Sequence, residues 1–571
     1  MLVVALFGLR FVCHQLFPQR VALVLSTVSS ATLAALLGSY YLITLIGLKS
    51  WGRVVSWGLI RSYVFQIPEL LDALEISFWL TFFFAALAFA VINVLIGVLL
   101  QKYDWIPRVG ARSNSRLAWT IFLIALIGTG IEAWHFLEFP QAIAGEPFSL
   151  TLNPNLGSKV LQNHYLHHEK ALETREDLVR ANLSPASNAK KRNVIIVVVD
   201  ALRADRMTFA GNNRPVVPYL SKLEKSGILH YNSWMHSVCA ESSCGLMALA
   251  SSRYLHQTIQ KPITLQEVLR RYGYRTHMML SGDHTNFYGL REAYGPLDSY
   301  FDGSMAGKGF YMNDDRAVLE HLSHFPASDD TPTFIQFHLM STHGLSKRYP
   351  EYSPFQPSRS YYADFGAPMS TTPDERYTNS YDNGVVATDA MIQKIIEMLR
   401  AKHYLENSVL IVTADHGEML GEHGKFGHAR GLDEAVLRIP FLMARFGYSS
   451  DESIPKRIVA SQIDIAPTIL SELNIPLPDT WSGLPLQDLA AGRKTRDFVF
   501  FQQGTEYGLL DTRLANAWWK FRVDAKDNSE FAFELLGDAA ETSNQQANLA
   551  PSQRAAWIKN LIDLQSFAHD Q

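Results

Sequence analysis

The stretch NVIIVVVD at residues 193–200 decides the fold. A continuous apolar run rich in β-branched residues is typical of a strand that is buried on both faces of a parallel sheet. The stretches TFIQFHL at 333–339 and VLIVTA at 409–414 have the same character. Helical patterns such as TLQEVLRRYG and ATDAMIQKIIEMLRAKH lie between these runs. The alternation predicts an α/β layered domain with a mostly parallel central sheet, over residues 191–571.

Each of the three predicted strands leads into side chains that can bind a metal or transfer a proton. Asp200 ends the first strand, and His343 follows the strand at 333–339. Asp415 and His416 directly follow the third strand. Sites in open α/β sheets lie beyond the carboxyl ends of the strands. We therefore expect these carboxylates and imidazoles to meet at one edge of the sheet, where they could hold a metal.

Residues 1–140 are predicted to form a helical membrane domain. Val21–Leu48, Phe78–Leu100 and Leu117–Ile131 carry no charged residue, and about 20 apolar residues in a helix cross a bilayer core. The first 17 residues are a further candidate, although Arg10 counts against them. Val54–Ile76 carries several charged residues, among them Arg61, Glu69 and Asp72, and is predicted to be an interfacial helix. The total is three to five spans, which neither a buried helical core nor a cleaved signal peptide explains.

The orientation follows from the loop at residues 101–116. This loop contains four Lys or Arg residues against a single acidic residue, Asp104. Such short basic loops stay on the cytoplasmic side. The last span then leads outward from the inner membrane, so that a polar linker with one amphipathic helix (141–190) and the α/β domain face the periplasm or the cell exterior.

The bulk composition excludes several classes of protein. Hydrophobic residues make up 47% and charged residues 19% of the 571 residues, which is not the composition of a disordered or collagen-like chain. The formal net charge of −4 gives no reason to expect a nucleic acid as partner.

Three later motifs resemble the sulfatase and alkaline-phosphatase superfamily. They are TADHGEMLGEHGKFGH (413–428), SQIDIAPTILSELNIPLPDTWSG (461–483) and FELLGDAAETSNQQANLA (533–550). The first is similar to the metal motif of that superfamily, and the last is similar to the signature in its small antiparallel sheet. The resemblance covers about residues 193–550 and implies a sulfatase-like sandwich with a small C-terminal antiparallel sheet.

The segment expected to carry the nucleophile, HSVCAESSCGLMALASSRY (236–254), departs from the sulfatase pattern. Aligned on its ending SSRY, the nucleophile is Ser242. Sulfatases convert this residue to formylglycine, which needs a Pro two residues on and an Arg four residues on, whereas Cys244 and Leu246 stand there. Counting from Cys239 instead gives Ser243, so both serines remain candidates. An ordinary helix N-cap is the structural alternative for either serine.

Two further departures point away from sulfatases. Ala201 follows Asp200 where sulfatases carry a second Asp, and Asp283 stands near the position of their sulfate-binding Lys. All of these features instead resemble the membrane-bound phosphoethanolamine transferases and the lipoteichoic acid synthase-type phosphoglycerol transferases.

That resemblance implies a metal-dependent transfer through a serine. Asp200, Ser242, Asp415 and His416 would hold one divalent metal, with zinc as the first expectation and manganese as the second. The serine would take the phosphoethanolamine or phosphoglycerol group from a phospholipid, diglyceride would leave, and an envelope glycan or lipid would accept the group.

The remaining histidines and the two cysteines near these motifs also have expected roles. His343 and His428 would bind the phosphate or act as acid and base. The other three histidines near these motifs, His284, His338 and His423, are expected to support the ligands or the fold. The two cysteines that flank the serines form either a disulfide or two buried thiols.

Two other functions remain open at this stage. The first is a membrane-anchored sulfatase-like hydrolase or phosphodiesterase, since the C-terminal signature is nearer to the hydrolases. The second is a non-catalytic lipid-binding regulator that has kept the fold; the intact set of Asp, His and hydroxyl groups argues against it.

Overall fold

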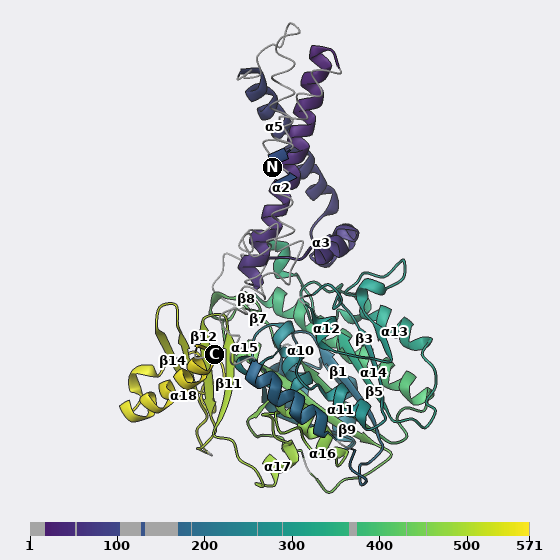
Figure 1. Cartoon of the computed structure of the whole chain (residues 1–571), viewed down its shortest axis with the longest axis vertical. Helices are drawn as coiled ribbons and strands as arrows, with labels where there is room; N and C mark the ends of the chain where they lie inside the picture. The colour runs from purple at the N-terminus through teal and green to yellow at the C-terminus, as the bar shows by residue number, and fades with distance from the viewer. Residues whose placement is uncertain are drawn as a thin grey trace. The chain divides into compact units, whose positions relative to one another are not determined.

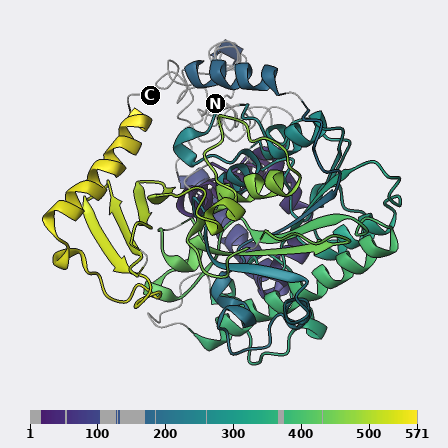
Figure 2. The ribbon, with the colours of Figure 1, turned by 90° about the horizontal axis from the view of Figure 1, so that it is seen from below.

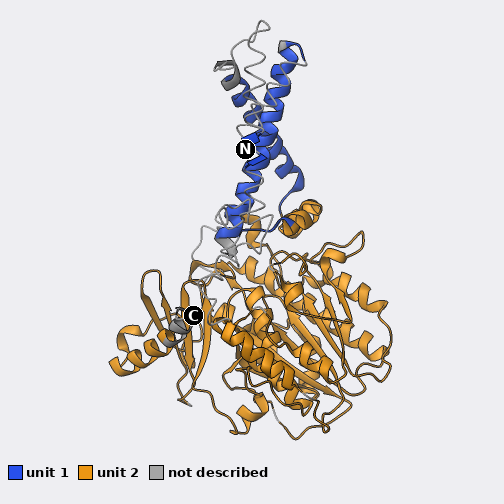
Figure 3. Cartoon of the chain, viewed as in Figure 1, with its two compact units in different colours: residues 1–57, 76–163 blue, residues 58–75, 164–571 orange. Residues whose placement is uncertain are grey.

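The computed structural model describes residues 17–51, 54–102, 127–131 without 129, and 170–569 apart from 184, 260, 288, 365–373, 430, 453 and 515. The chain divides into two compact units (Figure 3). The first unit contains residues 1–57 and 76–163, and the second contains residues 58–75 and 164–571.

The first unit contains two long apolar helices, α2 (Gln19–Trp51) and α5 (Phe78–Lys102). Arg20–Leu48 within α2 and Phe78–Val98 within α5 are long and apolar enough to cross a membrane. These segments correspond to the first two predicted spans. The third predicted span, Leu117–Ile131, and the stretch before residue 17 lie almost wholly outside the described residues.

An eight-stranded sheet forms the centre of the second unit (Figure 1), in the order β10-β2-β9-β6-β1-β5-β3-β4. Its strands are β1 (Asn193–Val199), β2 (Leu229–His236), β3 (Arg275–Leu280), β4 (Ser299–Phe301), β5 (Thr333–Leu339), β6 (Ser408–Ala414), β9 (Arg438–Phe446) and β10 (Ala460–Ser461). Only β9 runs antiparallel to its neighbours β2 and β6. The sheet is therefore mostly parallel, and its central strand β1 is the run that opens the sequence argument.

Helices cover both faces of this sheet, as the complete burial of β5 and β6 requires. One group of helices packs together as α9 (Pro218–Lys225), α13 (Asp315–Ser323) and α14 (Glu375–Ala401). The other group is α10 (Ser242–Ser251), α11 (Leu265–Arg271), α12 (Leu290–Ala293) and α16 (Ile465–Glu472). The short helix α17 (Leu486–Ala490) contacts α16.

A second sheet of four antiparallel strands follows, with α18 (Pro551–His569) along it (Figure 2). Its strands are β11 (Phe498–Gln503), β12 (Glu506–Asp511), β13 (Trp519–Asp524) and β14 (Ser529–Glu534). Trp557 of α18 packs against Phe521 of β13. The fully buried Lys520 pairs with Glu434 of α15 (Glu434–Leu437) at 2.9 Å, and with Glu541 at 2.9 Å. This ion-pair cluster joins the small sheet to the larger one.

The predicted interfacial segment forms two short helices, α3 (Trp57–Val64) and α4 (Ile67–Ala73). Residues 58–75 belong to the second unit, although they precede α5 in the chain. Ser62 Oγ donates to Asp283 Oδ2 at 2.6 Å, and Lys347 Nζ lies 2.9 Å from Asp72 Oδ2. A loop that connects two apolar helices is thus an integral part of the unit that contains the large sheet.

Candidate active site

The central strand β1 and its two neighbours supply most of the candidate site. Parallel pairing aligns Val198 with His338 of β5, and Val199 with Ala414 of β6. Asp200 and Asp415 are therefore the next residues on adjacent strands, and the main-chain N–H of Ala201 donates to Asp415 Oδ1 at 3.1 Å. The register itself brings two carboxylates and an imidazole together.

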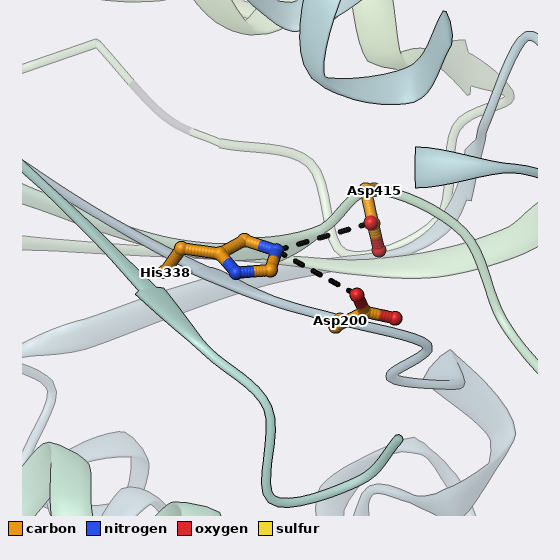
Figure 4. Close-up of side chains that lie close together, drawn as sticks. All are labelled: Asp200, His338 and Asp415. Carbon is orange, nitrogen blue, oxygen red and sulfur yellow. Dashed lines mark ion pairs between the residues drawn. The ribbon is translucent and has the colours of Figure 1, made fainter. Parts of the chain in front are cut away.

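Asp200, His338 and Asp415 form a buried group whose ligand atoms lie within 4.8 Å of one another (Figure 4). Nε2 of His338 is 3.9 Å from an oxygen of each aspartate. This Nε2, one oxygen of Asp200 and one oxygen of Asp415 are buried without a hydrogen-bond partner. Unpartnered buried acceptors are costly, so the group fits a cation that would bind all three.

The tautomers of two histidines suit metal binding. Nδ1 of His338 donates to the carbonyl of Ser281 at 3.2 Å, and Nδ1 of His416 donates to the carbonyl of Gly417 at 2.8 Å. In the neutral form of each ring, Nε2 is then the unprotonated nitrogen that faces the site. Nε2 of His416 lies 3.6 Å from Asp415 Oδ2, so its lone pair is directed at the same space.

Ser242, the first residue of α10, faces this group. Its Oγ lies 3.1 Å from His416 Nε2 and 3.4 Å from Asp200 Oδ2. Gly245, one turn further along α10, makes the approach possible, because a Cβ there would stand 2.4 Å from the carbonyl oxygen of Asp415. Ser243 instead donates its hydroxyl to Glu241 Oε1 at 2.7 Å.

A disulfide joins Cys239 to Cys244 and spans both serines. Of the two arrangements that the sequence left open, the structure has the bonded one. The closed loop holds the start of α10 in place beside the strand ends.

His343 and His428 lie on the other side of His416. The ring centroids of His416 and His428 are 4.3 Å apart, and those of His343 and His428 are 5.2 Å apart. Nδ1 of His428 bonds Glu418 Oε2 at 3.1 Å, and Nδ1 of His343 accepts from the N–H of Leu345 at 3.1 Å. In its neutral form, His343 therefore carries its proton on Nε2 and acts as a donor.

The environments of these two histidines move their pKa values apart. Burial, followed by the charge of His428, lowers the pKa of His343 to about 3. Burial alone would lower the pKa of His428, but the charge of Glu418 and its hydrogen bond outweigh burial and raise the pKa. His343 is thus neutral near neutral pH, whereas His428 keeps its proton to higher pH than an isolated histidine does, so the two rings suit different roles, hydrogen-bond donor and acid.

The pKa values of Asp200 and Asp415 also shift, because several charged groups lie close together in this buried site. Burial and then the charge of Asp415 raise the pKa of Asp200 to about 7. Burial would also raise the pKa of Asp415, but the charges of His416 and His338 outweigh it and hold the pKa low. Two carboxylates that repel each other in a buried site favour a cation between them.

The structure adds one histidine to the candidate metal ligands. His338, which the sequence predicts to support the ligands or the fold, is one of the three residues of the buried metal-type group. A histidine inside the buried strand TFIQFHL is the available signal, because a buried polar side chain in a strand needs a partner.

The other two supporting histidines lie outside that group. His284 meets His338 edge to face, with Nε2 3.2 Å from His338 Nδ1. His423 bonds Asp433 at 3.0 Å and the carbonyl of Glu541 at 3.1 Å. The first therefore orients a candidate ligand, and the second links the metal-motif loop to residues after the small sheet.

Comparison with known proteins identifies the fold that holds this site. Residues 192–475 match the family profile described as Sulfatase. These residues are a sulfatase-family domain. The match ends just before the small sheet and includes every candidate residue described above.

Curated relatives of this sulfatase-family domain include hydrolases and transferases. Arylsulfatase K of Canis lupus familiaris is 24% identical over 363 residues, 52% of this chain and 66% of the relative. Phosphatidylethanolamine transferase Mcr-2 of Escherichia coli is 25% identical over 331 residues, 56% of this chain and 57% of the relative. The chain thus spans less than two thirds of the length of either relative.

Solved structures support the same fold. BT4656, solved in complex with its substrate D-glucosamine-2-N,6-O-disulfate, superposes with a TM-score of 0.53 and 15% identity, covering 67% of this chain and 99% of that one. Similarity at this level of identity concerns the fold alone. It agrees with a sulfatase-like fold that has a mostly parallel central sheet and a small antiparallel sheet.

Proposed function

We propose that this protein is a membrane-anchored, metal-dependent phosphotransferase. It moves a phosphoethanolamine or phosphoglycerol group from a phospholipid to an envelope glycan or lipid through a serine-bound intermediate. The observation that carries the proposal is the Ser242 hydroxyl, which lies 3.1 Å from His416 Nε2 at the edge of a buried carboxylate–imidazole group. Such a hydroxyl is positioned as a nucleophile.

The donor set suits one divalent metal. Two carboxylates, two imidazoles and a hydroxyl, from Asp200, Asp415, His338, His416 and Ser242, favour zinc, with manganese as the second choice. A metal held by these residues would lower the pKa of the Ser242 hydroxyl and so favour loss of its proton to water.

The protein side chains then account for the two displacements. Ser242 Oγ forms a bond to phosphorus while the bond from phosphorus to the diglyceride oxygen breaks. His428 gives its proton to that leaving oxygen, and the Nε2–H of His343 donates to a phosphate oxygen. An acceptor hydroxyl next attacks phosphorus, His428 takes its proton, and Ser242 is released.

Ser242 is the proposed nucleophile, and Ser243 is not. The Ser243 hydroxyl is committed to Glu241 at 2.7 Å, whereas the Ser242 hydroxyl contacts two of the candidate ligands. At the start of α10, free main-chain N–H groups would also favour the negative charge of a bound phosphate.

A lipid donor is supported by where the domain stands in the chain. Two helices long enough to cross a bilayer precede it, and the loop between them, residues 58–75, is part of the same compact unit. Since that loop and the catalytic residues would then lie on one side of the membrane, these observations support the third span that the sequence predicts at Leu117–Ile131.

A hydrolase is the alternative that a specific observation favours. Arylsulfatase K and Mcr-2 match this chain with nearly equal identity, 24% and 25%. A hydrolase would use water in the second displacement, with the same serine and the same histidines.

The two functions differ in how they release diglyceride. Full-length protein in detergent micelles is incubated with fluorescent phosphatidylethanolamine or phosphatidylglycerol. A transferase releases a burst of diglyceride equal to the enzyme present and turns over only when an envelope-lipid extract is added. Steady release without acceptor supports the hydrolase, and no release from either lipid contradicts the proposal. The Ser242→Ala variant is the negative control, because it lacks the proposed nucleophile.

A further inference from the structure

A pocket beside the catalytic histidines contains a positive charge that the mechanism above does not use. It is lined by Thr342, Gly344, Arg348, Arg359, Ser360, Tyr361, Tyr377, Ser380, Tyr381, Glu418 and Leu420. Thr342 and Gly344 flank the catalytic His343, and Glu418 bonds His428. The pocket therefore adjoins the candidate active site.

Arg348 is the unusual member of this lining. Its guanidinium donates to the carbonyls of Ser380 at 3.1 Å, Ser346 at 3.3 Å and His343 at 3.4 Å. Among the residues that the structure describes, no carboxylate forms an ion pair with it. A guanidinium has five N–H donors, so two are left over after these three hydrogen bonds.

The surroundings hold this guanidinium in place. Arg348 is partly buried, and a Cβ at Gly384 of α14 would stand 3.3 Å from its Cζ and 2.4 Å from the carbonyl oxygen of Ser341. A glycine is therefore needed for the arginine and the chain after β5 to pack against the helix. An arginine held by carbonyls alone is preorganised at a cost in stability, because its charge is not compensated.

The other charges around the pocket are paired. Arg359 bonds Asp364 at 2.8 Å, and Glu418 bonds both His428 at 3.1 Å and the hydroxyl of Tyr361 at 3.0 Å. Burial, opposed in part by Glu75, lowers the pKa of Arg348 from its usual value. Among the described residues that line the pocket, Arg348 is thus the charged residue without an ion pair.

We propose that this pocket binds an oxyanion, a phosphate or carboxylate group, through the free N–H donors of Arg348. The anion belongs to one of the two substrates and is distinct from the phosphoryl group that Ser242 receives. A planar guanidinium with two N–H donors left over suits tetrahedral or planar oxyanions as hydrogen-bond acceptors. The assignment to a substrate rests on the proposed transfer reaction; the anion site itself does not.

Binding of inorganic phosphate tests the site independently of catalysis. Full-length protein in detergent, freed of metal by a chelator so that the metal centre does not bind phosphate, is titrated with inorganic phosphate. We expect Arg348→Gln to weaken binding at least tenfold. Arg376→Gln, which removes an exposed arginine paired with Asp374 at 2.6 Å, should leave binding unchanged. Equal affinities for wild type and Arg348→Gln, or no binding to wild type, would overturn the proposal.

A second measurement uses the wild-type chain, so its result does not depend on whether the Arg348→Gln variant folds. Phenylglyoxal modifies accessible arginines, and peptide mass spectrometry reports each site. Inorganic phosphate should slow modification of Arg348 several-fold and leave Arg376 unaffected. Unchanged modification of Arg348 at saturating phosphate contradicts an anion site there.

The two half-reactions tell which substrate carries the anion. If the anion is on the donor lipid, Arg348→Gln reduces the rate of the diglyceride burst from fluorescent phosphatidylethanolamine. If it is on the acceptor, the burst is unchanged and turnover with the envelope-lipid extract falls. A wild-type protein that gives no burst refutes the transfer reaction, while the phosphate measurements still decide whether the site exists.

Discussion

The hydroxyl of Ser242 lies 3.1 Å from Nε2 of His416, while the hydroxyl of the next residue, Ser243, bonds Glu241 at 2.7 Å. Adjacent residues of one helix therefore have different chemical surroundings. The Ser242 hydroxyl contacts two of the candidate metal ligands, so we expect the two serines to respond differently to loss of the hydroxyl.

Ser242→Ala should lower turnover of a fluorescent phospholipid donor by about 10³-fold or more, because it removes the atom that forms the covalent bond. Ser243→Ala should stay within about threefold of wild type, as expected for loss of one partly buried hydrogen bond. Similar losses in both variants would mean that the geometry of α10 does not identify the nucleophile.

His338→Ala should weaken metal binding by about 100-fold or more, since even residues that only orient ligands contribute 10–100-fold. The measurement is metal per protein after dialysis against a chelator of known affinity. His423→Ala is the matched control, because His423 bonds Asp433 and Glu541 rather than the buried group. Full metal content in His338→Ala would remove it from the ligand set.

Activity should fall with rising pH as His428 loses its proton. Glu418 raises the pKa of His428 above the usual 6.5, so the protonated acid persists to higher pH than in an isolated histidine. Glu418→Gln removes the raising charge and should move the alkaline limb of the kcat/KM profile to lower pH. A limb that stays in place, or moves to higher pH, would exclude His428 as the acid.

Lys520→Ala should destabilise the domain by about 3–5 kcal/mol, because Glu434 and Glu541 would lose their buried cation. Denaturant-induced unfolding of the full chain in detergent reports this free energy. Lys456→Ala, which breaks an exposed pair with Glu224, should cost within about 0.5 kcal/mol. Equal effects would show that the buried cluster does not hold the small sheet in place.

The loop at residues 58–75 should be accessible from the same side of the membrane as the catalytic domain. Asp72 and Lys347 form an ion pair at 2.9 Å, so a short bis-maleimide should link Asp72→Cys to Lys347→Cys in a Cys13→Ser background. The reagent is added to intact cells with a permeabilised outer layer. Failure to link, with each single cysteine reactive, would contradict the shared location.

Much of the fold follows from local sequence patterns. The run at 193–199 is β-branched and apolar, and it forms the central strand because both of its faces are covered. Asp200, Asp415 and His416 follow directly from strands, so the shared edge of a parallel sheet predicts their proximity. These inferences need only periodicity and the geometry of parallel strands.

Features set by long-range pairing were less accessible from the sequence. His338 enters the site because β5 pairs with β1 in a register that places it opposite Val198, and no local pattern specifies that register. The contact between Ser62 and Asp283 joins residues 221 positions apart, so the sequence could indicate an interfacial segment but not what it packs against. The choice between Ser242 and Ser243 as the proposed nucleophile likewise depends on the side-chain geometry at the start of α10.

The central claim, transfer through a serine next to a metal centre, is tested most directly by trapping the intermediate. Full-length metal-loaded protein is mixed with phosphatidylethanolamine without acceptor, quenched in acid and digested, and peptides spanning residues 236–254 are sequenced by mass spectrometry. The account predicts a phosphoethanolamine adduct on Ser242 that disappears when an envelope-lipid extract is added before the quench. An adduct on Ser243 or on another residue, or release of diglyceride without any adduct, would contradict it.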